Sequence, residues 1–373
     1  MAGTTLRILI VGAGIAGLGV ARALRLAGLR PDVVDREPPS AGPGAAIFLP
    51  GNATRALAGL GLTGPLRPLG AVIHRQSIRD SAGEPLCELD LGALWDGVGE
   101  SRALPRADLQ RVLVTAVGGV VRHNTAVTGL ELDEGGPVKV DFADGTRTEY
   151  DLVIGADGRR STIRALAGLG GTARRTGQFV YRSVVHGGPP LADWTGLLGA
   201  HSSFVVMPMG DRRLYCYAHE TVPEHATLPD DGLGRVREVF GGYGGPVPAV
   251  LDALEKVQLA APEEVEVAGW SRGRVLLVGD AAHSTSPTLS QGAAMALEDA
   301  IVLAEVLRTH AGDLPAALAS YEKRRRPRTR WVLDRTRDRD RTGDVAPDTR
   351  DPLLRKRGDR IFRDYYAPLR DPA

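Results

Sequence analysis

Three aspartates lie where buried β-strands are predicted to end, and two of them, Asp157 and Asp280, are next to a glycine. Asp35, Asp157 and Asp280 each come soon after an apolar run of strand type. A carboxylate at the end of a parallel strand can accept hydrogen bonds from the sugar hydroxyls of a nucleotide cofactor. Since the chain has only one dinucleotide fingerprint, the simplest interpretation is one large cofactor that several segments contact.

The first glycine-rich turn has the spacing of that fingerprint. Residues 12–17 read Gly-Ala-Gly-Ile-Ala-Gly, after the apolar run 6–11 and before a helical pattern. We expect Gly12 to permit the tight turn, Gly14 to let a pyrophosphate approach the backbone, and Gly17 to let helix and strand pack closely.

Asp35 stands at the distance from this turn that a ribose-binding acid requires. Its carboxylate would accept hydrogen bonds from the adenosine ribose and would repel a 2′-phosphate, which favours FAD or NAD over NADP at this position. Arg36 could stack on the adenine or be solvated.

The segment 274–300 combines a strand, an acidic turn and a helix. The apolar run 275–278 ends at Gly279-Asp280, and an Ala-rich helical pattern begins at Gln291-Gly292-Ala293. Asp280 can hold a ribityl or ribose hydroxyl, and the helix N-terminus can stabilise negative charge on a cofactor.

Two further residues have an alternative explanation. Arg106 lies in the first turn of a predicted helix, where a cation opposes the helix dipole, so it would suit a pyrophosphate or ribityl partner, or else an ion pair with Asp108. Asp157 could contact the cofactor or only shape its turn, and Ser161 is expected to cap the helix that follows.

The composition excludes several classes of protein. The chain has 373 residues, 43% hydrophobic content and a net charge of +1, which argues against nucleic-acid binding and membrane attachment. Its two cysteines form no metal-binding or disulfide pattern. We therefore expect a cytoplasmic protein with no metal and no membrane span.

Taken together, three motifs resemble those of the group A flavoprotein monooxygenases, the para-hydroxybenzoate hydroxylase-like family. They are GAGIAG with Asp35, GADGRRSTIR, and GDAAHSTSPTLSQGAAMALEDA, and the resemblance covers nearly the whole chain. It implies an α/β fold in which a Rossmann-type FAD-binding domain is interleaved with an antiparallel-sheet substrate domain. We expect the first domain over residues 1–69, 95–176 and 266–373, and the second over 70–94 and 177–265.

The resemblance also implies an activity. Transient NADPH or NADH would reduce bound FAD, and O2 would then form a flavin hydroperoxide that hydroxylates or epoxidises a small aromatic or polyketide-like substrate. A related reductase, halogenase or cyclase is the alternative, although the Trp-x-Trp-x-Ile-Pro motif of flavin halogenases is absent. A monomer or homodimer is expected. The residues expected to contact the cofactor are Gly12, Gly14, Ile15, Ala16, Gly17, Asp35, Arg36, Arg106, Asp157, Asp280, Gly292 and Ala293.

The substrate pocket is expected on an antiparallel sheet. In the strand 213–219, Leu214, Cys216 and Ala218 should face a core, whereas the alternate residues could line the pocket or face solvent. The pocket candidates are Arg182, Phe204, Met207, Tyr215, Tyr217, Pro287 and Leu289, and ordinary sheet packing is the alternative for each.

The sequence after residue 280 has three further features that carry expectations. Ser290 and Ala294 depart from the Gly-Gln-Gly-x-Asn pattern that is usual in the family. The resemblance implies that a side-chain contact to the flavin is lost, whereas the backbone donors remain. His283 is expected to be a structural histidine. The Arg-rich segment 321–341 is expected to be a solvated helical face with ion pairs.

Overall fold

A mainly parallel sheet organises the first half of the molecule. The computed structural model describes residues 6–39, 46–119, 121–133 and 135–373. The sheet contains β1 (Ile8–Val11), β2 (Asp32–Val34), β8 (Val121–Arg122), β12 (Leu152–Gly155), β20 (Ser271–Arg272) and β21 (Val275–Leu277). Their spatial order is β20–β21–β12–β1–β2–β8, with only the β20–β21 pair antiparallel. β1 is apolar and fully buried because it lies in the middle of this sheet.

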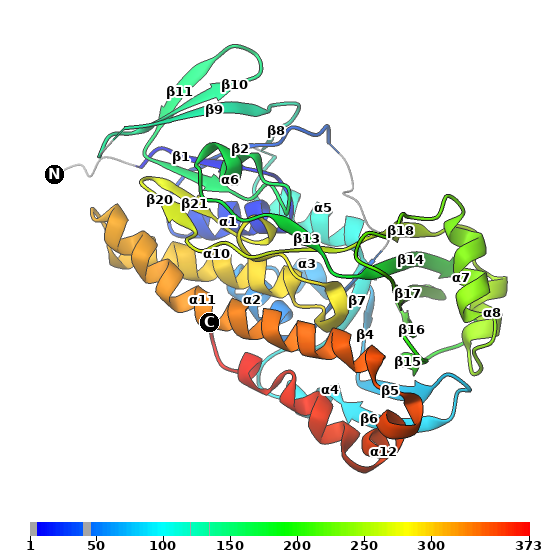
Figure 1. Ribbon diagram of the computed structural model, residues 1–373. Helices are drawn as coiled ribbons and strands as arrows, with labels where there is room; N and C mark the ends of the chain where they lie inside the picture. Colours follow the sequence, from blue (N-terminus) through cyan, green and yellow to red (C-terminus); the bar gives the residue numbers. More distant parts are fainter. Residues whose placement is uncertain (1–5, 40–45, 120, 134) are drawn as a thin grey trace.

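Helices cover one side of this sheet, and an antiparallel three-stranded sheet lies on the other side (Figure 1). The helices are α1 (Ile15–Leu26), α2 (Gly51–Gly59), α3 (Thr63–Leu66), α5 (Arg106–Ala116), α10 (Gly292–Thr309) and α11 (Leu314–Arg341). The three strands are β9 (Val127–Leu132), β10 (Val138–Phe142) and β11 (Arg147–Tyr150).

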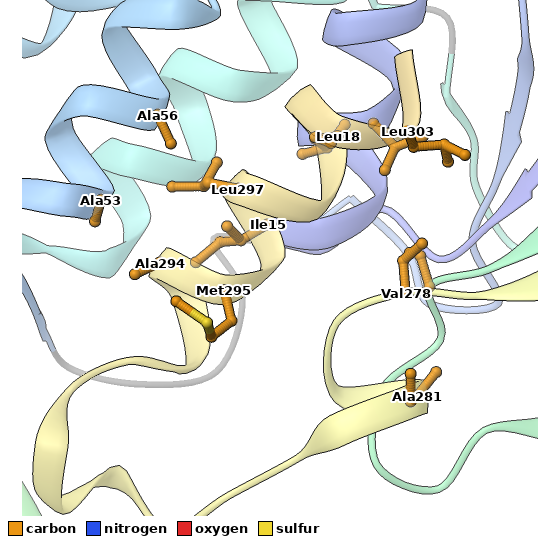
Figure 2. Packing of buried hydrophobic residues seen from close by; sticks show 14 of the residues in the cluster. Ile15, Leu18, Ala53, Ala56, Val278, Ala281, Ala294, Met295, Leu297 and Leu303 are labelled. Carbon is orange, nitrogen blue, oxygen red and sulfur yellow. The ribbon is translucent and has the colours of Figure 1, made fainter. Parts of the chain in front are cut away.

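Close packing of α1 against α10 joins two of the predicted motifs. Figure 2 shows Ile15 and Leu18 of α1 beside the α10 helix, which contributes Leu297. A Cβ at Gly19 would lie 3.4 Å from Leu297, so the small side of α1 lets the two helices approach.

A seven-stranded sheet forms the second half, and its strand order is β18–β14–β17–β16–β15–β5–β6. Its members are β5 (Arg75–Asp80), β6 (Pro85–Asp90), β14 (Gln178–His186), β15 (Trp194–Leu198), β16 (Ser202–Pro208), β17 (Arg213–Thr221) and β18 (Gln258–Ala260). All pairs are antiparallel except β15–β5. One face packs on α7 (Gly232–Phe240) and α8 (Val247–Asp252) in a separate hydrophobic cluster. Leu214, Cys216 and Ala218 belong to that cluster, as predicted.

The C-terminal segment extends from the first half to the second. After α11 come η2 (Thr342–Asp344), α12 (Pro347–Asp364) and η3 (Ala367–Arg370), and α12 packs on β6 (Figure 1). The remaining elements are β3 (Ala46–Leu49), β4 (Ala71–Val72), α4 (Leu91–Leu94), β7 (Arg102–Pro105), α6 (Thr162–Leu166), β13 (Ala173–Arg175), β19 (Glu263–Val265), α9 (Asp280–His283) and η1 (Pro287–Leu289). None of the described helices has the length and apolar character needed to cross a membrane.

Candidate active site

A cavity of about 670 Å³ lies where the two large sheets face each other. One wall comes from residues at the carboxyl ends of parallel strands, including Gly14, Ala156 and Asp280. The opposite wall comes from the seven-stranded sheet, including Met207 and Tyr215. Crevices at the carboxyl ends of parallel strands are the usual ligand sites of such folds, and this volume is within the usual range for ligand pockets.

The glycines of the first turn differ in what surrounds them. Gly12 has a φ of 109°, and a Cβ there would lie 2.4 Å from the carbonyl oxygen of Ala156. A Cβ at Gly17 would lie only 1.8 Å from the carbonyl oxygen of Gly12. Gly14 lines the cavity, has ordinary extended backbone, and would have nothing within 4 Å of its Cβ. The fold therefore requires Gly12 and Gly17, whereas the space at Gly14 is left for a ligand.

Two helix N-termini point into the same cavity. Gly14 is the N-cap of α1, and α10 begins at Gly292 after Gln291, whose side chain bonds to Asn52 and does not cap the helix. Neither helix has an acidic residue in its first turn. Their backbone N–H groups and positive dipole ends suit anionic groups such as a pyrophosphate or a reduced flavin. This arrangement fits FAD.

The acids at the three strand ends have different surroundings. Asp35 accepts hydrogen bonds from the backbone N–H groups of Ala13 (2.6 Å) and Glu37 (2.8 Å), so it holds the glycine turn. Asp280 lines the cavity and is exposed to it. Asp35 can still reach a ribose with its remaining acceptor capacity, because a carboxylate accepts several hydrogen bonds.

Asp157 bonds within its own loop. Its carboxylate accepts from the backbone N–H groups of Thr162 (2.7 Å) and Ile163 (3.1 Å) and from the Ser161 hydroxyl. The carboxylate thus shapes the turn before α6, and Asp157 is not among the cavity-lining residues. Ser161 caps α6 by accepting from the N–H of Arg164, as predicted.

Arg106 lines the cavity at the first residue of α5. The alternative ion pair with Asp108 does not form, because Asp108 pairs with Arg111 at 2.7 Å. Burial lowers the pKa of Arg106 and the nearby Asp280 opposes that effect. Within the described part of the chain no carboxylate oxygen lies within 4 Å of its guanidinium. Arg36, in contrast, is exposed and pairs with Glu37 at 3.4 Å.

Five of the seven pocket candidates line the cavity. The cavity-lining members are Arg182, Met207, Tyr215, Tyr217 and Pro287. His219, on the same face of β17 as the two tyrosines, also lines the cavity.

Phe204 and Leu289 do not line the cavity, and the alternative of ordinary packing describes both. Strand residues alternate between faces, so Val205 and Met207 face the cavity while Phe204 packs on Phe240, with ring centroids 5.3 Å apart. Leu289 turns into the hydrophobic core and is 2% exposed.

A buried polar network that sequence reasoning missed holds the Gly279-Asp280 turn. Asp299 of α10 is fully buried and accepts hydrogen bonds from the Gly279 N–H (2.9 Å), from Arg325 Nε (2.8 Å) and from His283 Nε2 (2.7 Å). Burial pushes the pKa of Asp299 upward, but His283 and Arg325 hold that pKa well below its usual range. His283 is therefore structural, as expected.

Arg325 also corrects the interpretation of α11 as a solvated face. It has 0% exposure and bonds to Glu298 and Asp299. Other arginines of the helix do form exposed pairs, such as Arg330 with Asp334 at 3.0 Å.

The structure also shows the surroundings of three further residues, Gln110, Ser290 and Ala294. Gln110 donates from Nε2 to the carbonyl of Ala13 at 2.6 Å and so supports the glycine turn. Ser290 lines the cavity, and its backbone has a left-handed φ of 55°. A glycine, which is usual in the family at this position, adopts that conformation without strain because it has no Cβ. Ala294 is fully buried.

Comparison with known proteins decides the family. The model of the "FAD binding domain" family matches residues 5–336. The chain belongs to this family. It is an FAD-dependent monooxygenase of the para-hydroxybenzoate hydroxylase-like group, with the predicted fold and with FAD as its cofactor.

The relatives of this monooxygenase match over nearly their whole length. An FAD-dependent urate hydroxylase of Mycolicibacterium vanbaalenii is 34% identical over 350 residues, which are 90% of this chain and 88% of the relative. A 3-amino-4-hydroxybenzoate 2-monooxygenase of Streptomyces platensis is 37% identical over 349 residues, or 89% and 87% of the two chains. A solved structure of a variant of Klebsiella pneumoniae HpxO with FAD has a TM-score of 0.90 at 29% identity, covering 98% of this chain and 99% of HpxO. HpxO with FAD and uric acid has a TM-score of 0.86 at 28% identity, covering 98% and 97%.

Proposed function

We propose that this monooxygenase uses NADPH or NADH and O2 to hydroxylate a small aromatic substrate bound against the seven-stranded sheet. The observation that carries the proposal is the two-sided cavity. Two helix N-termini suited to a flavin nucleotide stand on one side, and Tyr215, Tyr217 and Met207 stand on the other. Aromatic and thioether side chains favour contact with an aromatic ring. Epoxidation of a substrate double bond is the second reaction open to the same cofactor.

The chain offers a set of residues for each part of FAD. We assign the pyrophosphate to the start of α1 near Gly14, Ile15 and Ala16, and the adenosine ribose to Asp35. Asp280 and Arg106 would hold the ribityl chain and the flavin edge. Bound FAD supplies hydride acceptance and the activation of dioxygen. The backbone N–H groups at Gly292 and Ala293 would stabilise negative charge on the flavin ring.

The substrate side combines exclusion of water with polar groups that can orient a ligand. Leu198, Val205 and Met207 contribute apolar surface to the cavity. Burial raises the pKa of Tyr215, so its phenol stays neutral and can donate a hydrogen bond. Arg182 lines the cavity, and no carboxylate of the described residues lies within 4 Å of it. These groups would orient a ring that carries hydrogen-bond acceptors.

The proposal includes three broader statements. The six-stranded and seven-stranded sheets are taken as the centres of an FAD-binding domain (1–69, 95–176 and 266–373) and a substrate domain (70–94 and 177–265). The enzyme is taken to work as a monomer or homodimer. It is placed in the cytoplasm, where its two unpaired cysteines would stay reduced.

A substrate screen tests the proposal. Purified protein loaded with FAD should be yellow, and a correct aromatic substrate should accelerate its NAD(P)H and O2 consumption. Urate and 3-amino-4-hydroxybenzoate come first, because relatives are named for them. A product heavier by one oxygen atom supports the proposal. Protein that cannot take up FAD would contradict it.

A further inference from the structure

One arginine on the cavity wall has no carboxylate partner and is not used by the cofactor site. Arg339, near the end of α11, lines the cavity, and no carboxylate oxygen of the described residues lies within 4 Å of its guanidinium nitrogens. Other cavity arginines are paired. Arg159 pairs with Glu263 at 2.8 Å, and Arg350 pairs with Asp351 at 2.8 Å. A partly buried cation without a counter-charge costs free energy, and an anionic ligand would supply that charge.

The guanidinium of Arg339 is held in place by groups that do not neutralise it. It stacks on the ring of Phe362 in α12, with 4.5 Å between the guanidinium carbon and the ring centroid. Its Nη1 donates to the Thr342 hydroxyl at 3.4 Å. Asp340, the next residue, instead accepts hydrogen bonds from two hydroxyls of the segment 286–288. An arginine fixed in this way is preorganised to bind the oxygens of an anion such as a carboxylate.

Ser203 and His219 line the same end of the cavity as Arg339. They are paired across β16 and β17, and 2.9 Å separates Ser203 Oγ from His219 Nδ1. Burial and the nearby charge of Arg339 lower the pKa of His219 to about 4, so the imidazole is neutral at neutral pH. Arg339 is therefore the charged member of this group, and the Ser203 hydroxyl can donate a further hydrogen bond to the same anion.

This group lies far from the flavin end of the cavity. Burial raises the pKa of Tyr215 and the charge of Arg106 opposes the rise, so Tyr215 is close to the residue assigned to the flavin edge. His219 is four residues further along β17, which is about 13 Å of extended strand. Val205 lines the cavity between the two ends. Since an aromatic ring is shorter than this distance, a ligand that reaches both ends must have a side chain.

We propose that Arg339 and the Ser203 hydroxyl bind an anionic group at the end of a substrate side chain, while the aromatic ring lies at the flavin end. The inference rests on the proposed function and narrows its substrate to an aromatic compound with an acidic side chain. Arg339 would contact the substrate and determine specificity without taking part in oxygen transfer. A neutral group of the same size would leave the guanidinium without a counter-charge, so the enzyme should select acids over the matching amides.

Matched acids and carboxamides of increasing length test the inference. The probes are 4-hydroxybenzoate, 3-(4-hydroxyphenyl)propanoate and 5-(4-hydroxyphenyl)pentanoate, each compared with its own carboxamide. Each is titrated against the oxidised FAD-loaded enzyme, and the change in flavin absorbance gives its Kd. The longest acid should bind about tenfold or more tightly than its carboxamide, as expected for a hydrogen bond to a charged group. The preference should be smaller for 4-hydroxybenzoate, which has no side chain long enough to reach Arg339.

Four variants make the test specific. Arg339→Gln should abolish the preference for the acid, and Ser203→Ala, which leaves the packing of α11 unchanged, should reduce it. Arg341→Gln removes an exposed cation from the same end of α11 and should keep the full preference. Arg182→Gln removes an arginine of the sheet wall and should keep the ratio of acid to carboxamide affinity. FAD retention and flavin reduction by NAD(P)H, measured on each variant, show that the cofactor site is intact.

Three results would overturn the inference. They are an absence of preference for any acid in the wild-type enzyme, a preference that survives Arg339→Gln, and a preference that is lost in Arg182→Gln. A rise in KM for NADPH or NADH in Arg339→Gln, with the acid preference unchanged, would also overturn it by assigning the arginine to the nicotinamide nucleotide. Failure of the proposed function is distinct, since an enzyme that prefers the acids but forms no oxygenated product would keep the anion site and lack the activity.

Discussion

Gly14 and Gly17 belong to one motif, but glycine is needed at the two positions for different physical reasons. A Cβ at Gly17 would collide with the Gly12 carbonyl at 1.8 Å, whereas a Cβ at Gly14 would meet nothing within 4 Å. The fingerprint assigns a different requirement to each position, and the space around the two glycines differs accordingly.

Replacement of Gly14 should therefore weaken cofactor binding without weakening the fold. We expect Gly14→Ala to keep the wild-type melting temperature without FAD and to lose FAD affinity about tenfold, or about 1.4 kcal/mol. Gly17→Ala should lower stability itself, by about 1–3 kcal/mol for overpacking. Thermal melts and FAD titration measure both.

Gly64→Ala is the matched control, because a Cβ at Gly64 also has nothing within 4 Å but Gly64 does not line the cavity. Its FAD affinity should be that of the wild type. Equal FAD affinity in Gly14→Ala and wild type would show that no cofactor group approaches this backbone.

At the residue scale, alternation along one strand was enough to group the β17 side chains that line the cavity. Tyr215 and Tyr217 share a face of β17, and both line the cavity. Phe204 does not line the cavity, because alternation along β16 places Val205 and Met207 on the cavity side. The position of Asp299 beside Gly279 could not be predicted, because no local pattern shows which residue of α10 meets that turn.

At the scale of elements, the contact between α10 and α11 positions the turn that carries Asp280. Arg325 of α11 bonds to Glu298 and Asp299 of α10, and Asp299 in turn holds Gly279. The sequence of α11 alternates basic and acidic residues, which is typical of an exposed helix. The burial of Arg325 follows from its partners on another helix and could not be predicted from α11 alone.

Replacement of Arg325 should lower the free energy of unfolding by several kcal/mol. Arg325→Met would remove the buried cation that Glu298 and Asp299 share. Glu298 would keep its pair with Arg328, and Asp299 its bond to His283. Removal of one partner of a buried pair costs about 3–5 kcal/mol. Arg330→Met, whose guanidinium forms exposed pairs, should change the free energy of unfolding by less than about 1 kcal/mol. Urea unfolding compares the two, and similar small losses for both would contradict the structural role of the network.

The same network predicts a pH dependence of stability. His283 and Arg325 hold the pKa of Asp299 below its usual range despite burial, so its ionised form stabilises the fold. That contribution is present above the unfolded-state pKa of about 3.9 and is lost as pH falls below it. Asp299→Asn should therefore be less stable than wild type at neutral pH, and the gap should narrow below about pH 4. Urea unfolding at several pH values measures this gap, and a constant gap would argue against a charged Asp299.

At the scale of the whole molecule, the motifs were sufficient to predict the fold class. The three strand ends meet at one edge of the parallel sheet because parallel strands place their carboxyl ends together. The course of the C-terminal segment was not predictable. α12 packs on β6 of the other sheet, and Arg350 bonds to the carbonyls of Leu198 and Gly199, although residues 266–373 were assigned to the FAD-binding domain.

The central claim is that the cavity brings FAD, dioxygen and an aromatic substrate together for hydroxylation. The most direct measurement is one turnover reaction with isotopically heavy dioxygen, NAD(P)H and a substrate found by the screen, followed by mass spectrometry of the product. The account predicts a product that gains one oxygen atom carrying the heavy isotope. Substrate-stimulated NAD(P)H oxidation that yields hydrogen peroxide and no labelled product would contradict it.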